Sequence, residues 1–232
     1  MKILIILLAF FILPLDASAK ASYTRADERA YRVPEKFNNN LDELTNYLIQ
    51  PFQKNDELKA RVIFAWIVYN IQYDAYELKT SYEWNRADSD LYCFTDDTQK
   101  IHCAKQSPFD TFKKRSGVCR HFADLFQYMA TKAGLKSVII TGQSMKQGHA
   151  WNAVKIKDKW HLLDATWAAS SQNAFQGIKT DKSYKRAIEI RERKIKNNRI
   201  KASKRIKEEW FFAHPKKFFK THIPNDKQWK LF

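Results

Sequence analysis

The sequence predicts a single α+β domain, and three of its features lead to this prediction. Apolar residues recur at helical spacing through the first part of the chain, as at Leu41, Leu44 and Leu48. After Gly148 the pattern changes to the apolar–polar alternation of strands. The chain has 232 residues, 44% of them hydrophobic, which is enough for one packed core, and only 5 Gly and 6 Pro, which excludes collagen-like and low-complexity architectures. Helices followed by strands are typical of α+β proteins.

Residues 1–19 are predicted to be a secretory signal peptide. Lys2 precedes an unbroken apolar run from Ile3 to Leu13, and the small residues Ala17-Ser18-Ala19 follow. The run is shorter than the roughly 20 residues of a transmembrane helix. We therefore expect cleavage after Ala19 and a secreted or periplasmic protein in an oxidising compartment. A buried N-terminal helix is the alternative interpretation.

Residues 20–54 are predicted to form a helical lead-in to a core domain at 55–176. Asn55 is suited to cap a helix whose first turn carries Asp56 and Glu57, where the helix dipole favours acidic residues. The helix is expected to bury one apolar face, formed by Leu58, Val62, Ala65, Trp66 and Tyr69. A long polar stretch at 74–107 follows.

The chain has 3 cysteines, and two of them lie in this polar stretch. In an oxidising compartment, Cys93 and Cys103 are natural disulfide partners. Closing a loop of this size stabilises a protein by roughly 2–3 kcal/mol in the chain-entropy model. Cys119 is then left over, either as a reactive thiol or as a small buried core residue.

The surroundings of Cys119 favour the reactive interpretation. Ser116 is predicted to cap a helix that ends near Gly134, which places Cys119 at about its third position. The unsatisfied N–H groups of a first helical turn favour a thiolate, as do the cations Arg115 and Arg120. The same N–H groups could also stabilise an oxyanion.

A nucleophilic cysteine needs a base and an orienting acid, and a predicted hairpin supplies both. The strand that contains His149 and the strand that leads to Asp164 are joined by a turn at Lys157-Asp158. With this even-length turn, Asp164 lies opposite Trp151 and one diagonal away from His149; a one-residue slip would separate the two side chains. A structural histidine and a capping aspartate are the alternatives.

Other histidines and a metal site fit the pattern less well. His121 follows the cysteine by two residues and points elsewhere on the helix, and His161 has the wrong strand parity to share a face with Asp164. His102 lies in the polar stretch, and His214 and His222 lie in the tail. Neither C-x-x-C nor H-E-x-x-H occurs, so we expect no metal.

Three blocks around these residues resemble the transglutaminase-like superfamily: Ser116-Gly117-Val118-Cys119, Gly148-His149-Ala150-Trp151-Asn152 and Trp160-His161-Leu162-Leu163-Asp164-Ala165-Thr166-Trp167. The stretch at 60–74 is similar to the helix that precedes these blocks in the family. The tail, at 210–212 and 221–229, further resembles the kyphoscoliosis-peptidase-like branch. Arg120-His121 departs from the acidic residue and glycine that often follow the cysteine in this family.

The resemblance implies a papain-like cysteine-protease fold, with N-terminal helices packed on an antiparallel sheet. It also implies Cys119 as nucleophile, His149 as base and acid, and Asp164 as the orienting residue. The implied reaction is acyl transfer at a protein or peptide amide without a cofactor. We expect a peptidase or amidase; a cross-linking transglutaminase and a non-catalytic binding module with the same fold are the alternatives. The second oxyanion donor is unassigned, with Trp84 as a candidate.

The segment 177–208 is expected to be a basic, solvated helix. Between Lys179 and Lys207 it carries thirteen Lys or Arg residues against three acidic ones, which accounts for most of the net charge of +16. The charge either serves solubility or docks the protein to an anionic surface such as lipid, acidic glycan or acidic protein. No recognition motif for nucleic acid is present. The aromatic segment 209–232 is predicted to pack on the core.

Overall fold

A computed structural model describes residues 15–74, 92–95, 101–104, 107–169, 178, 180–197, 201–203 and 205–230. Its helices are α1 (Leu15–Tyr31), α2 (Leu41–Ile49), α3 (Asp56–Asn70), α5 (Pro108–Lys114), α6 (Cys119–Lys132), α7 (Ala165–Ala168), α8 (Asp181–Lys196) and α9 (Pro215–Phe218). Its strands are β1 (Gln72–Tyr73), β2 (Tyr92–Thr95), β3 (Ile101–Ala104), β4 (Ser116–Gly117), β5 (Ser137–Ser144), β6 (Gln147–Ile156), β7 (Lys159–Leu163) and β8 (His222–Pro224). Short 3-10 turns are η1 (Glu35–Asn38), η2 (Gln50–Phe52), η3 (Glu208–Trp210) and η4 (Lys227–Lys230).

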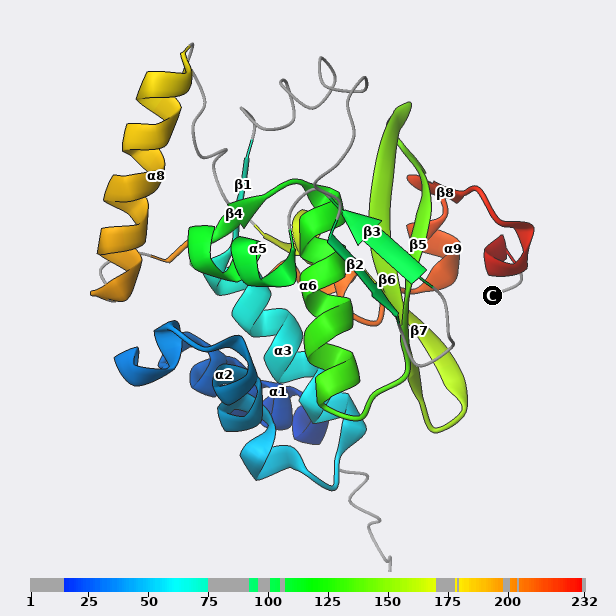
Figure 1. Cartoon of the computed structure of the whole chain (residues 1–232). Helices are drawn as coiled ribbons and strands as arrows, with labels where there is room; N and C mark the ends of the chain where they lie inside the picture. The colour runs from blue at the N-terminus through cyan, green and yellow to red at the C-terminus, as the bar shows by residue number, and fades with distance from the viewer. Residues whose placement is uncertain are drawn as a thin grey trace, which may run out of the picture.

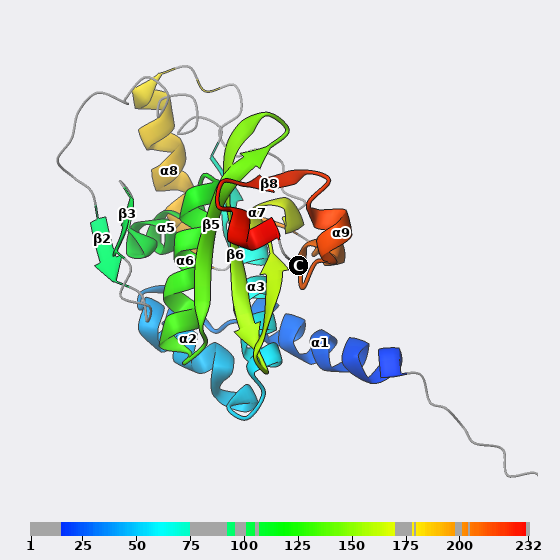
Figure 2. The same ribbon diagram turned by 90° about the vertical axis from the view of Figure 1, so that its right-hand side faces the viewer.

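The main sheet has four antiparallel strands in the order β7-β6-β5-β8. Helix α6 packs on one face of this sheet, and α3 packs behind α6, with α1 and α2 against α3 (Figure 1). Figure 2 looks onto the sheet, with α6 and α3 behind it, β8 in front of its upper part and α9 to its right. The arrangement of helices on an antiparallel sheet confirms the predicted α+β class.

The central helix α3 begins as predicted but is buried more completely than predicted. The Asn55 side chain accepts a hydrogen bond from the Leu58 N–H and caps the helix. Every residue from Lys59 to Tyr69 is buried, so the other sides of the helix are buried together with the predicted apolar face. The reason is tertiary: α1, α2, α6 and α7 enclose α3 from different sides. Arg61 is fully buried because Asp27 of α1 and Glu208 of η3 both bind its guanidinium group.

The predicted hairpin that carries the candidate base and acid is present. Lys157 and Asp158 form its turn, with positive φ angles of 46° and 67°, as a two-residue type I′ turn requires. Asn152 pairs with Leu163. Because the strands are antiparallel, the preceding residue Trp151 lies opposite the following residue Asp164. The even-length turn expected from the sequence is therefore confirmed.

The helix that carries Cys119 begins later than predicted. Ser116 is buried in β4, and Val118 rather than Ser116 precedes the helix. The cause is a parallel pairing with β1: the Gln72 N–H donates to the Arg115 carbonyl, and the Asp74 N–H donates to the Gly117 carbonyl, each at 2.9 Å. This pairing keeps the backbone extended up to Val118. Cys119 is thus the first helical residue and not the third.

The N-terminal helix α1 passes through Ala19, the residue before the predicted cut. Beyond that point α1 packs on α3, where Ala26 and Ala30 are fully buried. Most of the predicted signal peptide, residues 1–14, lies outside the described part of the chain, so its cleavage stays a prediction. None of the helices in the described ranges has the length and apolar character needed to cross a membrane.

The predicted disulfide partners face each other across a hairpin. Cys93 of β2 and Cys103 of β3 are Cα partners in an antiparallel pair. The side chains of both strands lie outside the described part of the structure, so the disulfide stays a prediction.

The C-terminal third wraps around the core. The basic helix α8 ends at Lys196, earlier than the expected helical segment, because residues after it run along the core instead. There the Ala202 N–H donates to the Tyr69 carbonyl at 2.7 Å, and Ile206 forms a bridge to Ala169. The aromatic segment 209–232 then packs on the sheet through buried side chains such as Phe218, and β8 pairs with β5.

Candidate functional site

The candidate nucleophile lies at the tip of helix α6. Cys119 is the free, half-buried cysteine of the described residues. As the first residue of α6, it lies beside backbone N–H groups that have no partner within the helix. These groups carry the positive end of the helix dipole.

The two cations expected to assist Cys119 are engaged elsewhere. Arg120 Nε donates to both carboxylate oxygens of Asp124, at 3.0 and 2.9 Å. The Arg115 guanidinium is buried, and its Cζ lies 4.5 Å from the ring centroid of Trp66 and 4.4 Å from that of Phe112. Both guanidinium groups are therefore bound to other side chains of the structure.

The candidate base His149 connects the other two predicted residues. Its Nε2 lies 2.6 Å from Oδ2 of Asp164. Its other ring nitrogen, Nδ1, is left for the hydrogen bond with the Cys119 sulfur. Burial alone lowers the pKa of His149, but the Asp164 carboxylate and the Cys119 sulfur outweigh this effect and raise the pKa to about 10. The arrangement thus favours a protonated imidazole at neutral pH.

Asp164 is held in place by three hydrogen bonds. It caps α7, where its Oδ1 accepts from the Trp167 N–H at 3.0 Å. Its Oδ2 accepts from His149 and also from Nε2 of His222, at 2.9 Å. Burial raises the pKa of Asp164, but the attraction and hydrogen bonds of the two histidines hold the pKa well below its usual range. Asp164 is therefore a fixed negative charge.

His222 is the member of this cluster that the sequence interpretation missed. It is fully buried, and its Nδ1 lies 2.8 Å from Oγ1 of Thr221. The Thr221 hydroxyl itself donates to the Phe218 carbonyl at 3.2 Å. No local pattern marks His222. The resemblance of the tail to the kyphoscoliosis-peptidase-like branch was the available signal, and it did not assign His222 a role.

Aromatic rings enclose the two histidines. Trp151 and Trp167 lie beside His149, with ring centroids 5.9 and 6.0 Å from its own. His222 stacks on Phe218 at 4.0 Å and contacts Trp210 at 5.3 Å. These rings exclude water from the His149–Asp164–His222 contacts and so strengthen their electrostatic interactions.

His149, Asp164 and His222 also form a group of metal-ligand types, with their ligand atoms within 4.8 Å of one another. The two imidazole nitrogens lie 2.6 and 2.9 Å from the same carboxylate oxygen. Two ligands of a tetrahedral zinc ion, each 2.0–2.1 Å from the metal, would lie about 3.3 Å apart. The spacing therefore fits a hydrogen-bonded network and not a metal centre.

The histidine two residues after Cys119 holds the backbone of the turn before the helix. His121 is buried, and its Nδ1 accepts a hydrogen bond from the Val118 N–H at 3.1 Å. Burial, with the charges of Lys114 and Arg120, lowers the pKa of His121 to about 3. A Cβ atom on Gly117 would come within 2.6 Å of the His121 Cβ, so only glycine fits there. His121 thus shapes the turn before Cys119.

The remaining candidates lie apart from this cluster. His161 stacks on Phe212, with ring centroids 4.4 Å apart. His214 is exposed before α9. Trp84, the candidate second oxyanion donor, lies outside the described residues.

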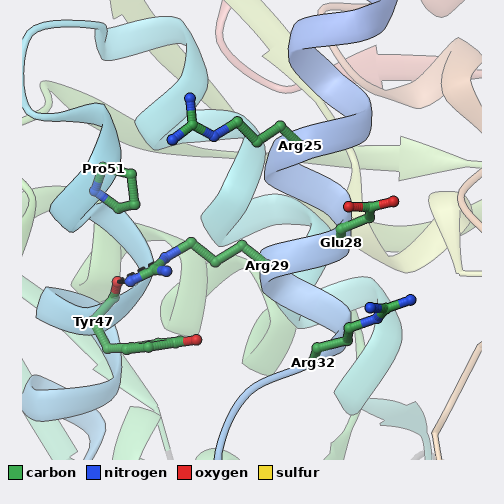
Figure 3. Close-up of a pocket in the computed structure, with 6 residues that line it drawn as sticks. All are labelled: Arg25, Glu28, Arg29, Arg32, Tyr47 and Pro51. Carbon is green, nitrogen blue, oxygen red and sulfur yellow. Dashed lines mark hydrogen bonds between the residues drawn. The ribbon is translucent and has the colours of Figure 1, made fainter.

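A cavity of about 270 Å³ lies between α1 and α2, away from this cluster (Figure 3). Arg29 crosses it and donates from Nε to the carbonyl oxygens of Tyr47 and Leu48 at 2.9 and 3.1 Å. Its guanidinium carbon lies 3.9 Å from the centroid of the Tyr47 ring. Arg29 thereby binds the last turn of α2 to α1, so the side chain that crosses this cavity has a structural role.

Comparison with known proteins places the chain in a family. A family model described as "Transglutaminase-like domain" matches residues 39–196. The chain is 26% identical over 231 residues to kyphoscoliosis peptidase of Mus musculus and 25% identical over 221 residues to that of Homo sapiens. These matches cover 94% and 90% of the chain, but only 28% and 26% of the relatives' own lengths.

A solved structure of a candidate cysteine protease from Cytophaga hutchinsonii is similar at 23% identity and a TM-score of 0.37. The similarity covers 59% of this chain and 40% of that one. The family model decides the assignment, because it spans more than half of the chain, from α2 to α8, and includes Cys119, His149 and Asp164. The chain belongs to the transglutaminase-like domain family.

Proposed function

We propose that this protein is a cysteine enzyme that hydrolyses amide bonds of proteins or peptides, with Cys119, His149 and Asp164 as its catalytic triad. The observation that supports this most strongly is the 2.6 Å contact between Oδ2 of Asp164 and Nε2 of His149, together with the influence of the Cys119 sulfur on the pKa of His149. A nucleophile, a base next to it and an acid that orients the base are the parts that such a reaction needs.

In the proposed reaction, the Cys119 thiolate attacks the carbonyl carbon of a substrate amide, and the carbonyl oxygen becomes negatively charged. The free N–H groups of α6 lie at the sulfur's end of the helix and can donate to that oxygen. Protonated His149 gives its Nδ1 proton to the leaving nitrogen, the C–N bond breaks, and a thioester remains. Water then gives a proton to His149 and attacks the thioester, which releases the carboxylic acid and restores the pair.

Hydrolysis and amine transfer share this thioester. Water attacks it in hydrolysis, and a primary amine attacks it in amine transfer. The name of the mouse and human relatives supports hydrolysis. Incubation of the protein with casein and a labelled primary amine distinguishes the two reactions. We expect fragments of casein that depend on Cys119. Incorporation of the amine without fragmentation would contradict hydrolysis, and neither product would indicate a binding module.

We also propose that the protein is secreted after removal of residues 1–19. The charged start, short apolar run and Ala17-Ser18-Ala19 support this proposal. Mass spectrometry of the protein recovered outside the producing cell tests it. A chain beginning at Lys20 is expected, and an intact N-terminus on the cytosolic protein would contradict it.

We further propose that α8 docks the enzyme to an anionic surface. Its exposed side carries five cations, Lys182, Lys185, Arg186, Arg193 and Lys194, while Tyr184 on the other side donates to Asp74 at 2.8 Å. Binding to vesicles with anionic lipid should weaken steeply from low to moderate salt and should fall on charge reversal of Lys185 and Arg186. Reversal of Lys216 and Lys217 in α9 is the matched control. Salt-independent binding would contradict docking.

A further inference from the structure

We propose that a cavity beside the triad binds a bulky, uncharged side chain of the substrate, close to the amide that is cleaved. This inference rests on the proposed function and assigns its specificity. The cavity has a volume of about 540 Å³. The residues of its lining that carry the argument are Tyr73, Thr166, Trp167, Lys207, Glu209 and Trp210.

Two residues that line the cavity lie close to His149 and to the turn before Cys119. On one side, the Trp167 ring lies 6.0 Å from the His149 ring, measured between centroids. On the other side, Tyr73 pairs in β1 with Gly117, two residues before Cys119. Cys119 and His149 do not line the cavity themselves, but each lies close to one of its walls, so a side chain in the cavity would lie near the groups that attack and protonate the substrate.

Aromatic rings give the cavity its apolar character. Trp167 and Trp210 meet nearly at right angles, with an interplanar angle of 80° and centroids 4.9 Å apart. Both rings and that of Tyr73 are half-buried, so part of each remains available to a ligand. Two perpendicular ring faces offer a corner in which an aromatic or branched aliphatic side chain can pack.

The charges at the cavity favour a neutral occupant. Lys207 and Glu209 are both exposed and carry opposite charges. A cationic or anionic side chain would meet one attractive and one repulsive partner, whereas a neutral side chain meets no penalty. The volume lies within the usual range of ligand pockets, so a glycine would leave it empty while a phenylalanine or leucine would fill part of it.

Peptide chloromethyl ketones that alkylate Cys119 test the proposal. The residue at each of the two positions before the reactive carbon is varied among Phe, Leu, Gly, Lys and Glu. We expect Phe or Leu at one of these positions to alkylate at least about tenfold faster than the other three. Thr166→Phe, which fills the cavity, should abolish this preference. Thr131→Phe at the exposed far end of α6 is the matched control and should keep it.

The same variants distinguish failure of this proposal from failure of the proposed function. Iodoacetamide needs no cavity, so its rate with Thr166→Phe should equal that of the wild type. Rapid iodoacetamide alkylation without side-chain preference among the peptides would overturn the cavity proposal alone. If iodoacetamide reacts slowly, saturation-transfer NMR with Cys119→Ala still tests the cavity. N-acetyl-phenylalaninamide should bind to the Cys119→Ala variant. It should not bind to the double variant that also carries Thr166→Phe. Equal binding of N-acetyl-lysinamide to Cys119→Ala would overturn the proposal.

Discussion

Nε2 of His222 lies 2.9 Å from Oδ2 of Asp164, the same oxygen that binds His149. This contact joins the C-terminal segment to a residue 58 positions earlier in the chain. It leaves the carboxylate with one orientation, because Oδ1 is already bound by the Trp167 N–H. The orientation of the His149 ring therefore depends on the Asp164 carboxylate, and the orientation of that carboxylate depends on His222.

Replacement of His222 should impair the triad without removing any of its members. His222→Phe leaves Asp164 Oδ2 with one donor, so we expect the rate of amide hydrolysis to fall roughly tenfold to a hundredfold. His222→Gln keeps a donor and should retain more of the activity. A purely structural role would instead lower the stability of both variants alike and leave the pH profile unchanged. Rates and denaturation midpoints of the two variants, measured together, separate these outcomes.

Asp164→Asn should shift the pH dependence of the reaction. The carboxylate raises the pKa of His149 to about 10, so the imidazole stays protonated through neutral pH in the wild type. Removing the negative charge lowers this pKa. The rate at pH 8 should therefore fall more than the rate at pH 6, and the loss of activity on the alkaline side should begin at a lower pH. Identical pH–rate profiles of the two proteins would contradict this coupling.

His121 should make the fold sensitive to acid. Its pKa is lowered to about 3 in the folded protein, so below about pH 6.5 the unfolded chain takes up a proton that the folded chain refuses. Stability therefore falls as the pH drops from about 6.5 towards 3, by up to about 1.4 kcal/mol per pH unit from this group. His121→Gln can still accept from Val118 and should lose this part of the acid dependence.

Urea denaturation at several pH values measures the effect. His214→Gln replaces an exposed histidine and should keep the wild-type acid dependence. If His121→Gln and the wild type lose stability in parallel between pH 6.5 and 4, the buried neutral state of His121 is not the cause.

Cys93 and Cys103 should form a disulfide in the protein recovered from an oxidising compartment. Directly opposed residues of an antiparallel pair have Cα atoms about 4.5–5.5 Å apart, within the range that disulfides span. Alkylation under denaturing, non-reducing conditions should modify Cys119 alone, and reduction should expose two more thiols. A bridge that includes Cys119 would contradict both this pairing and the catalytic role of Cys119.

The parts of the site that depend on local pattern were predicted from the sequence. The parity of the hairpin brought His149 and Asp164 together, because a two-residue turn fixes the register of both strands. The cap of α3 at Asn55 followed from the same kind of local rule.

The parts that depend on long-range pairing were not predicted. Ser116 is a good capping residue, yet the pairing of β4 with β1 draws it into a strand, and the helix starts at Cys119. His222 reaches Asp164 only because β8 joins the edge of the sheet beside β5. Neither pairing has a signal within a few residues of sequence, and tertiary contacts override local preference at both.

The rate at which iodoacetamide alkylates Cys119 at pH 6 tests the central claim most directly. A thiolate held by His149 and the end of α6 reacts much faster than a free thiol at that pH, so we expect rapid labelling of Cys119 in the wild type and a large loss of rate in His149→Ala. Mass spectrometry of timed samples follows the reaction, with glutathione as the reference thiol. A wild-type rate no faster than that of glutathione, and unchanged in His149→Ala, would contradict the assignment of the triad.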